Sequence, residues 1–135
     1  MSGSPSWELQ QSVFTRLNTD ATLVTTLGAA VYDNVPAGAA FPYVALGDVT
    51  EVPNDTMGRT GRDFTLTFHT WSQYVGMKQV KEIQNRIDQL LDRWAPTVTG
   101  WTAIQMLQEF FETFRDPDGV TRHGVARYRI HIQAS

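Results

Sequence analysis

The chain contains no cysteine, which excludes disulfides, thiolate metal sites and cysteine nucleophiles. It is also short of charge, because Asp, Glu, Lys and Arg make up only 19% of its 135 residues, below the roughly one quarter that is usual. So little charge indicates that partners cover part of the surface. No apolar run approaches the roughly 18 residues of a membrane span, and residues 1–5 lack the basic and apolar regions of a signal peptide. We therefore expect a globular protein made in the cytosol, with no membrane contact.

Acidic residues outnumber basic ones, 14 against 11, so the net charge is −3. This balance argues against a protein whose main task is to grip nucleic acid, because that task needs an excess of lysine and arginine. A length of 135 residues corresponds to one domain with a core of its own. We expect a single domain over residues 1–135, with a short loose lead-in over residues 1–5.

Apolar residues at helical spacing predict three helices. The first begins near Ser4 or Ser6, and its apolar face consists of Leu9, Val13, Phe14 and Leu17. A second, short helix has Asp20 as its cap and Gly28 as its stop. The strongest pattern spans residues 76–93. Its core-facing stripe consists of Val80, Ile83, Ile87, Leu90, Leu91 and Trp94.

Extended patterns predict five strands, over residues 31–35, 41–52, 62–72, 102–114 and 120–133. Two of them alternate cleanly between apolar and polar residues. The inward residues are Phe64, Leu66 and Phe68 in one strand, and Ala126, Tyr128, Ile130 and Ile132 in the other. The element order α-α-β-β-β-α-β-β, with hairpin-like connections, predicts an α+β fold. We expect a mostly antiparallel sheet with the helices packed on one face.

Two connections stand out. Residues 52–61 are rich in proline, glycine, Asn and Asp, and predict a flexible loop of about ten residues, a length that is often functional. The run Asp116-Pro117-Asp118-Gly119 predicts a tight turn between the last two strands. A calcium loop would need further oxygen ligands and a glutamate after the glycine, and neither is present.

The sequence contains no arrangement of residues that is typical of a catalytic site. His69, His123 and His131 have no second histidine at ligand spacing, and no glycine-rich phosphate loop or nucleophile elbow occurs. We therefore expect no enzyme activity, no catalytic or metal-binding residue and no cofactor.

A basic stripe follows the last strand, formed by Arg122, Arg127, Arg129 and His131. One interpretation is a solvated sheet face whose charge is offset by Gln105, Glu109 and Glu112 on the neighbouring strand. The other is a patch for an acidic partner or for DNA. The acidic total favours the first interpretation.

Phe110 and Phe111 are adjacent, so within a strand they must point to opposite faces of the sheet. One of the two rings then lies outside the core unless a second layer or a second subunit covers it. This arrangement favours an oligomer.

Three stretches in this order resemble a known family. The first stretch is Val31-Tyr32, followed by Pro36 and Phe41-Pro42-Tyr43-Val44. The second is His69-Thr70-Trp71-Ser72, followed by Gly76 and the apolar helix. The third is the closing hairpin over residues 116–128. Together with the opening helices they span nearly the whole chain. The sequence resembles the tail terminator, or tail-completion, proteins of long-tailed bacteriophages and phage-derived particles.

The resemblance implies a structural protein of the virion, located at the head–tail junction. Such proteins form a homo-oligomeric ring, usually a hexamer, that stops polymerisation of the tail tube. The implied partners are the tail tube protein and the head connector, with DNA only as cargo passing the ring. The neighbouring role of a head-completion or stopper protein stays open, and so does a small nucleic-acid-binding module. As interface residues we select Asp55, Arg59, Arg62, Phe111, Asp116, Arg122, Arg127 and Arg129.

Overall fold

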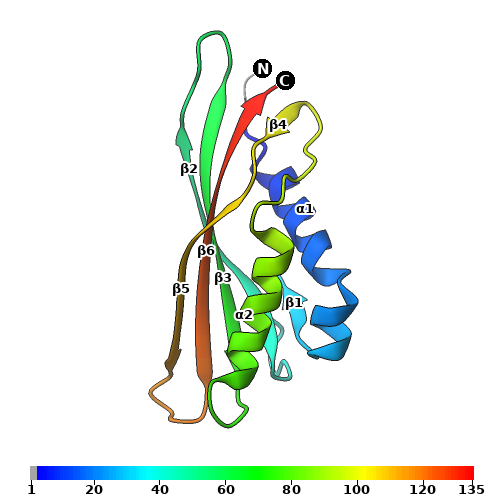
Figure 1. Cartoon of the computed structure of the whole chain (residues 1–135), viewed down its shortest axis with the longest axis vertical. Helices are drawn as coiled ribbons and strands as arrows, with labels where there is room; N and C mark the ends of the chain where they lie inside the picture. The colour runs from blue at the N-terminus through cyan, green and yellow to red at the C-terminus, as the bar shows by residue number, and fades with distance from the viewer. Residues whose placement is uncertain (1–2) are drawn as a thin grey trace.

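A curled sheet with helices on one side is the frame of the molecule (Figure 1). The computed structural model describes residues 3–135. Its elements are α1 (Ser6–Asn18), the short π-helix η1 (Thr22–Thr26), β1 (Ala30–Tyr32), β2 (Tyr43–Pro53), β3 (Gly61–Ser72), α2 (Lys78–Leu91), β4 (Trp101–Ala103), β5 (Leu107–Arg115) and β6 (Arg122–Ala134). In this part of the chain no helix is both long and apolar enough to cross a bilayer.

The sheet runs β1-β2-β3-β6, and the far side of β6 is shared by β4 and β5. Only β1 lies parallel to its neighbour; the other pairings within residues 3–135 are antiparallel. The long β3–β6 ladder places Phe64 opposite Ile130 and Phe68 opposite Ala126, so the predicted inward residues of both strands share one face. The prediction of an α+β fold with a mostly antiparallel sheet is confirmed.

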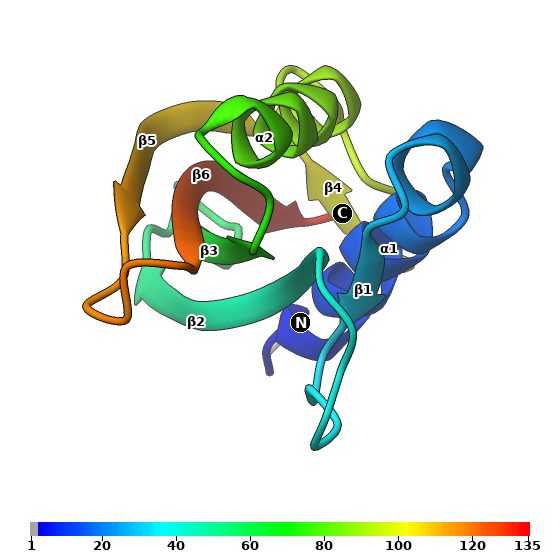
Figure 2. The ribbon, with the colours of Figure 1, turned by 90° about the horizontal axis from the view of Figure 1, so that it is seen from below.

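The core lies between that inward face and the helices, as the view from below shows (Figure 2). From α1 it takes Leu9, Val13 and Leu17, and from α2 it takes Val80, Ile83, Ile87 and Leu91, all essentially inaccessible to water. These residues recur every three or four positions, which explains why both segments fold as amphipathic helices on a sheet. The short η1 is capped as expected, because the amide of Leu23 donates a 2.9 Å hydrogen bond to Asp20.

The strand expected over residues 102–114 is wrong as one piece. It is divided into β4 and β5, which pair with different parts of β6. Between them Met106 turns into the core, where it is fully buried. Its amide donates to the carbonyl of Trp94 and its carbonyl accepts from the amide of Arg93. The backbone of Met106 is therefore hydrogen-bonded to the segment just after α2. A buried methionine thus interrupts the strand.

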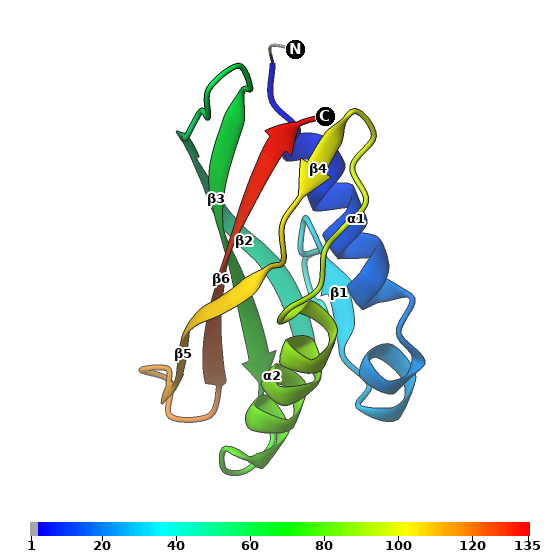
Figure 3. The ribbon, with the colours of Figure 1, turned by 45° about the horizontal axis from the view of Figure 1, so that its top comes forward.

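The flexible loop expected over residues 52–61 is also different in the structure. The β2–β3 pairing continues to Pro53 and Arg62, and beyond it Thr56 and Arg59 exchange backbone hydrogen bonds of 3.0–3.1 Å. The segment is therefore the end of a hairpin that projects past the body (Figure 3). We call residues 54–60 the tip.

The loose lead-in expected over residues 1–5 falls partly outside the described residues. Within them, Ser4 donates a 2.8 Å hydrogen bond to Glu51 of β2, and Pro5 is buried. Residues 4 and 5 are thus held against the body, so the expectation is wrong for them.

Candidate assembly surfaces

The base of the tip is held by a small network of charges. The guanidinium of Arg62 donates to Glu51 over 3.1 Å and lies 3.6 Å from Asp55. The carboxylate of Asp55 also accepts the amide of Gly61 at 2.8 Å. Two of the selected interface residues, Asp55 and Arg62, therefore stabilise the hairpin itself.

The end of the tip is different, because its side chains make few contacts. Met57 is fully exposed, with a relative accessibility of 103%. Arg59 is exposed too, and no carboxylate of the described chain lies within ion-pair distance of it. Gly58 takes the left-handed conformation at φ +81°, which allows the tight turn. Of the three residues selected here from the sequence, Arg62 and Asp55 are engaged with each other, and Arg59 is exposed without an ion-pair partner in residues 3–135.

The turn between β5 and β6 is built around Asp118. Its carboxylate accepts the amides of Val120 and Thr121 at 2.9 and 2.8 Å, and the hydroxyl of Thr121 at 2.7 Å. These hydrogen bonds, above all the one from the Thr121 amide, lower the pKa of Asp118. The predicted turn is thus stabilised by hydrogen bonds within itself, from two backbone amides and one hydroxyl to the carboxylate of Asp118.

Arg122 and Asp116 flank this turn and differ in role. Arg122 is buried, and its guanidinium donates to the carbonyl of Val120, so it holds the turn from inside rather than facing a partner. Asp116 is half-buried and lies 3.9 Å from the ring of His123.

The basic stripe is interrupted on the uncovered face of the sheet. The guanidinium of Arg127 lies over the ring of Phe110, 5.0 Å from its centre, while Arg129 is exposed. His131 is bound by Asp63 at 2.6 Å. An aromatic ring and a carboxylate thus lie among the basic side chains here, which supports a mixed face rather than a continuous track for DNA.

Phe110 and Phe111 point to opposite faces, as predicted. Phe111 lies opposite Ala126 on the helix side, and Phe110 opposite Arg127 on the uncovered side. Neither ring is buried, however: their accessibilities are 38% and 37%. The reason is that β5 ends the sheet and the helix side is only partly covered there by α2, so the inward ring also keeps contact with water.

A cluster of aromatic and histidine rings lies on the uncovered face, near the β5–β6 turn. Trp71 stacks on His123 with 3.8 Å between ring centres, and Phe114 packs on the same imidazole at 4.8 Å. His69 and His123 share a 2.8 Å hydrogen bond between ring nitrogens. Burial lowers the pKa of both histidines, and the neighbouring imidazole lowers that of His123 further.

The sequence pattern missed this cluster because its members come from three strands. Trp71 and His69 alternate on β3, but only the register places His123 opposite Trp71 and Phe114 opposite His123. Within residues 3–135 no group of three His, Asp or Glu side chains is placed to hold a metal ion.

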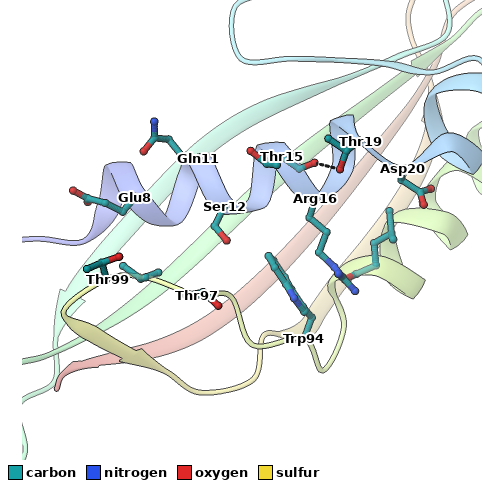
Figure 4. A pocket seen from close by; sticks show the side chains of 12 residues that line it. Glu8, Gln11, Ser12, Thr15, Arg16, Thr19, Asp20, Trp94, Thr97 and Thr99 are labelled. Atoms are coloured by element: carbon teal, nitrogen blue, oxygen red, sulfur yellow. Dashed lines mark hydrogen bonds between the residues drawn. The ribbon is translucent and has the colours of Figure 1, made fainter.

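A groove of about 670 Å³ lies between α1 and the segment after α2 (Figure 4). We call it the α1 groove. Its floor includes Trp94, and the guanidinium of Arg16 lies over the indole ring, 4.5 Å from the ring centre. Polar side chains line the rest: Glu8, Gln11, Ser12, Thr15, Thr97 and Thr99. Trp94 was expected in the core; it is half-buried and forms part of this open surface.

The chain was compared with known proteins. The family model described as tail completion protein gp17 matches residues 11–133. A curated relative, tail completion protein gp17 of Bacillus phage SPP1, is 28% identical over 92 residues, which cover 68% of each chain.

Two solved structures share the fold. A chain of the virion of a native gene transfer agent particle superposes with a TM-score of 0.89 at 20% identity, over 98% of this chain and 100% of that one. The structure of bacteriophage SPP1 gp17 superposes with a TM-score of 0.61 at 22% identity, over 96% of this chain and 95% of that one. At these identities the superpositions establish a common fold.

Proposed function

Because the chain belongs to the tail completion protein gp17 family, and is thus a structural component of a phage-type virion tail, we propose that it forms a ring at the head-proximal end of the tail tube. There the ring stops polymerisation of the tube and joins the tail to the head connector. A hexameric ring of identical copies is the form that we expect.

One observation carries the proposal: the same rigid ladder presents a hairpin end at each extreme of the long axis (Figure 1). The tip lies at one extreme, and the turn at residues 116–121 at the other. The tip leads into β3 and the turn leads into β6, and these two strands pair over twelve residues without interruption. A subunit built in this way can make separate contacts at its two ends while its body stays unchanged, as a protein that assembles with several partners requires.

The passage of DNA fits the electrostatics of the uncovered sheet face. A ring through which DNA moves must not bind it tightly, and binding strength follows the number of phosphates neutralised by lysine and arginine. On this face Arg127 and Arg129 keep their charge, but His131 is bound by Asp63, and the chain as a whole has a net charge of −3. DNA is thus cargo rather than ligand in the proposed role.

The test is deletion of this reading frame from its parent phage or phage-like particle, followed by negative-stain electron microscopy. We expect overlong tail tubes without heads. Tails of normal length beside unjoined heads would instead indicate the neighbouring role of a head-completion protein. Unchanged, fully joined particles would overturn both roles.

A nucleic-acid-binding module is tested separately, with the purified protein and a fluorescent DNA duplex at about 50 mM salt, where non-specific phosphate contacts are strong. We expect no binding. Binding that weakens with salt and disappears in the Arg127→Ala/Arg129→Ala variant would overturn the cargo interpretation.

A further inference from the structure

Two surfaces of the described chain are open to solvent, the tip and the α1 groove. We propose that the tip of one copy binds in the α1 groove of the next copy, and that this contact links the subunits of the ring. The inference rests on the proposed function, and it specifies which surfaces of two identical chains meet.

The tip offers one apolar group and one positive charge. Met57 has no neighbour that shields it from water, which is unusual for a large apolar side chain at the end of a hairpin. Arg59, two residues on, has no carboxylate of the described chain within ion-pair distance, because Asp55 is engaged by Arg62 and by the Gly61 amide. Methionine is also well suited to packing on an aromatic ring.

The α1 groove offers the matching groups. Trp94, Leu90 and Val98 contribute apolar surface, and the surrounding hydroxyls can bind the free amides and carbonyls of a turn. Of its three charged side chains, Asp20 is paired with Arg86, whereas Arg16 keeps its charge, donating to the carbonyl of Leu90 and lying over the ring of Trp94.

Glu8 is the other carboxylate of the groove. No hydrogen bond or ion pair to its carboxylate occurs within residues 3–135, and its side chain lies on the exposed side of the first turn of α1 (Figure 4). A single unpaired carboxylate in the groove thus corresponds to a single unpaired guanidinium on the tip. This complementarity of charge identifies a second copy of the chain as the occupant.

The placement of the two surfaces also fits a ring. The β2–β3 hairpin and the start of α1, which lines the groove, lie on opposite sides of the end of β6 (Figures 1 and 3). A contact between two different surfaces is heterologous, and it closes into a ring when the rotation per subunit divides a full turn. The groove, about 670 Å³ in volume, is widely open to solvent, so a projecting segment of another molecule can reach it.

Cysteine cross-linking in assembled particles tests the contact directly, because the natural chain has no cysteine to interfere. The Met57→Cys/Thr97→Cys variant places one thiol on the tip and one in the groove, and it replaces the natural gene in the parent particle. After mild oxidation, a non-reducing gel should show a ladder of multiples of the 15.2 kDa chain. The control variant Met57→Cys/Val75→Cys, whose second thiol lies on the exposed loop before α2, should give no ladder.

A charge exchange gives a second measurement that does not depend on thiols. Arg59→Glu and Glu8→Lys should each reduce, severalfold, the yield of particles with joined heads, and the double variant should restore it. Restoration also shows that the single variants fold, since misfolding would persist in the double variant.

The outcomes separate the contact from the ring itself. Normal tails with no 57–97 ladder, or a cross-link only to another protein, overturn the contact and leave the proposed function standing. Tails that are unchanged by deletion of the whole gene overturn the proposed function. Additive losses in the charge-exchanged double variant also overturn the contact.

Discussion

The hydroxyl of Tyr128 donates a 2.9 Å hydrogen bond to the carboxylate of Asp88. Tyr128 lies in the middle of β6 and is completely buried, whereas Asp88 stands on α2, so the bond joins the sheet to the helix that covers it. Burial raises the pKa of Tyr128 strongly, and the hydrogen bond to Asp88 raises it further. The phenol therefore stays protonated and remains a donor at every ordinary pH.

Removing that hydroxyl should destabilise the fold without creating a large cavity. Tyr128→Phe leaves the carboxylate of Asp88 without its donor, and we expect the free energy of unfolding to fall by roughly 1–3 kcal/mol. Chemical denaturation measures this directly. Tyr74→Phe, at an exposed tyrosine, is the matched control and should change little. Equal stability of both variants would contradict a structural role for the bond.

Local patterns predicted the helices and the long strands well, because the residues that define them repeat within one segment. Leu9, Val13 and Leu17 follow the helical period and Phe64, Leu66 and Phe68 the strand period, and burial agrees in every case. What failed depends on contacts between distant segments. Met106 ends β4 because its backbone pairs with the residues after α2, and no local signal marks that exchange.

The candidate interface was predicted less well, for a related reason. Charge and turn composition identified Arg59 and Arg62 alike. Only the structure shows that Arg62 reaches Glu51, whereas no carboxylate of residues 3–135 lies within ion-pair distance of Arg59. The α1 groove and the histidine cluster were not found at all. Both are formed where side chains from separate elements meet, which requires the register and the helix positions to be known.

A second prediction concerns the ion pair that fastens η1 to α2. Arg86 binds both oxygens of Asp20 at 2.7 and 2.8 Å, and this hydrogen bonding lowers the pKa of Asp20 below its usual 3.8. The stabilisation is present in full above that value and is lost as the pH falls through the lowered pKa. The stability gap between the natural protein and Asp20→Asn should therefore shrink below about pH 4, near the ordinary pKa of an aspartate.

The capping role of Asp20 can be separated from its charge. Asparagine keeps an oxygen that accepts the Leu23 amide, whereas alanine does not. Asp20→Ala should consequently be less stable than Asp20→Asn by about 1 kcal/mol at pH 7, measured by denaturant unfolding. Identical stability of the two variants would mean that the cap contributes nothing.

The third prediction follows from the partial exposure of both β5 rings. Truncation to alanine of a buried ring such as Phe68, at 2% accessibility, should lower the free energy of unfolding by about 3–5 kcal/mol. Phe110→Ala and Phe111→Ala should each cost clearly less, because both rings already contact water in the folded chain. Thermal and denaturant unfolding of the three variants decides the ranking. A loss at Phe111 as large as that at Phe68 would show that α2 covers this ring more fully than its exposure indicates.

The fourth prediction is a local one at the base of the tip. A methyl group added at Gly61 would collide with the backbone oxygen of Asn54, so the two strands must separate there. We expect Gly61→Ala to lower the free energy of unfolding by about 1–3 kcal/mol, as overpacking usually does. Hydrogen exchange at the amides of Thr56 and Arg59 should accelerate as well. Val75→Ala, at an exposed residue of the loop before α2, is the control. Unchanged exchange at these two amides would mean that the tip folds independently of its base.

The fifth prediction concerns pH and the His69–His123 pair. Desolvation lowers the pKa of both imidazoles, and the facing carboxylates, Asp48 for His69 and Asp116 for His123, offset it only in part. In the unfolded chain both take up protons near pH 6.5, whereas in the folded chain they resist protonation until a lower pH. The unfolded state then binds more protons, so stability must fall as the pH decreases below 6.5.

Stability measured from pH 7.5 to pH 5.5 isolates this effect, because most carboxylates titrate below that range. The natural protein should lose stability across it, and His69→Asn/His123→Asn should show a flatter profile. His131→Asn is the control, since His131 is bound by Asp63 away from the pair and its removal should leave the slope caused by the pair intact. If the double variant keeps the full slope, the loss arises elsewhere. In that case protonation of the two imidazoles, whose ring nitrogens lie 2.8 Å apart, does not lower the free energy of unfolding.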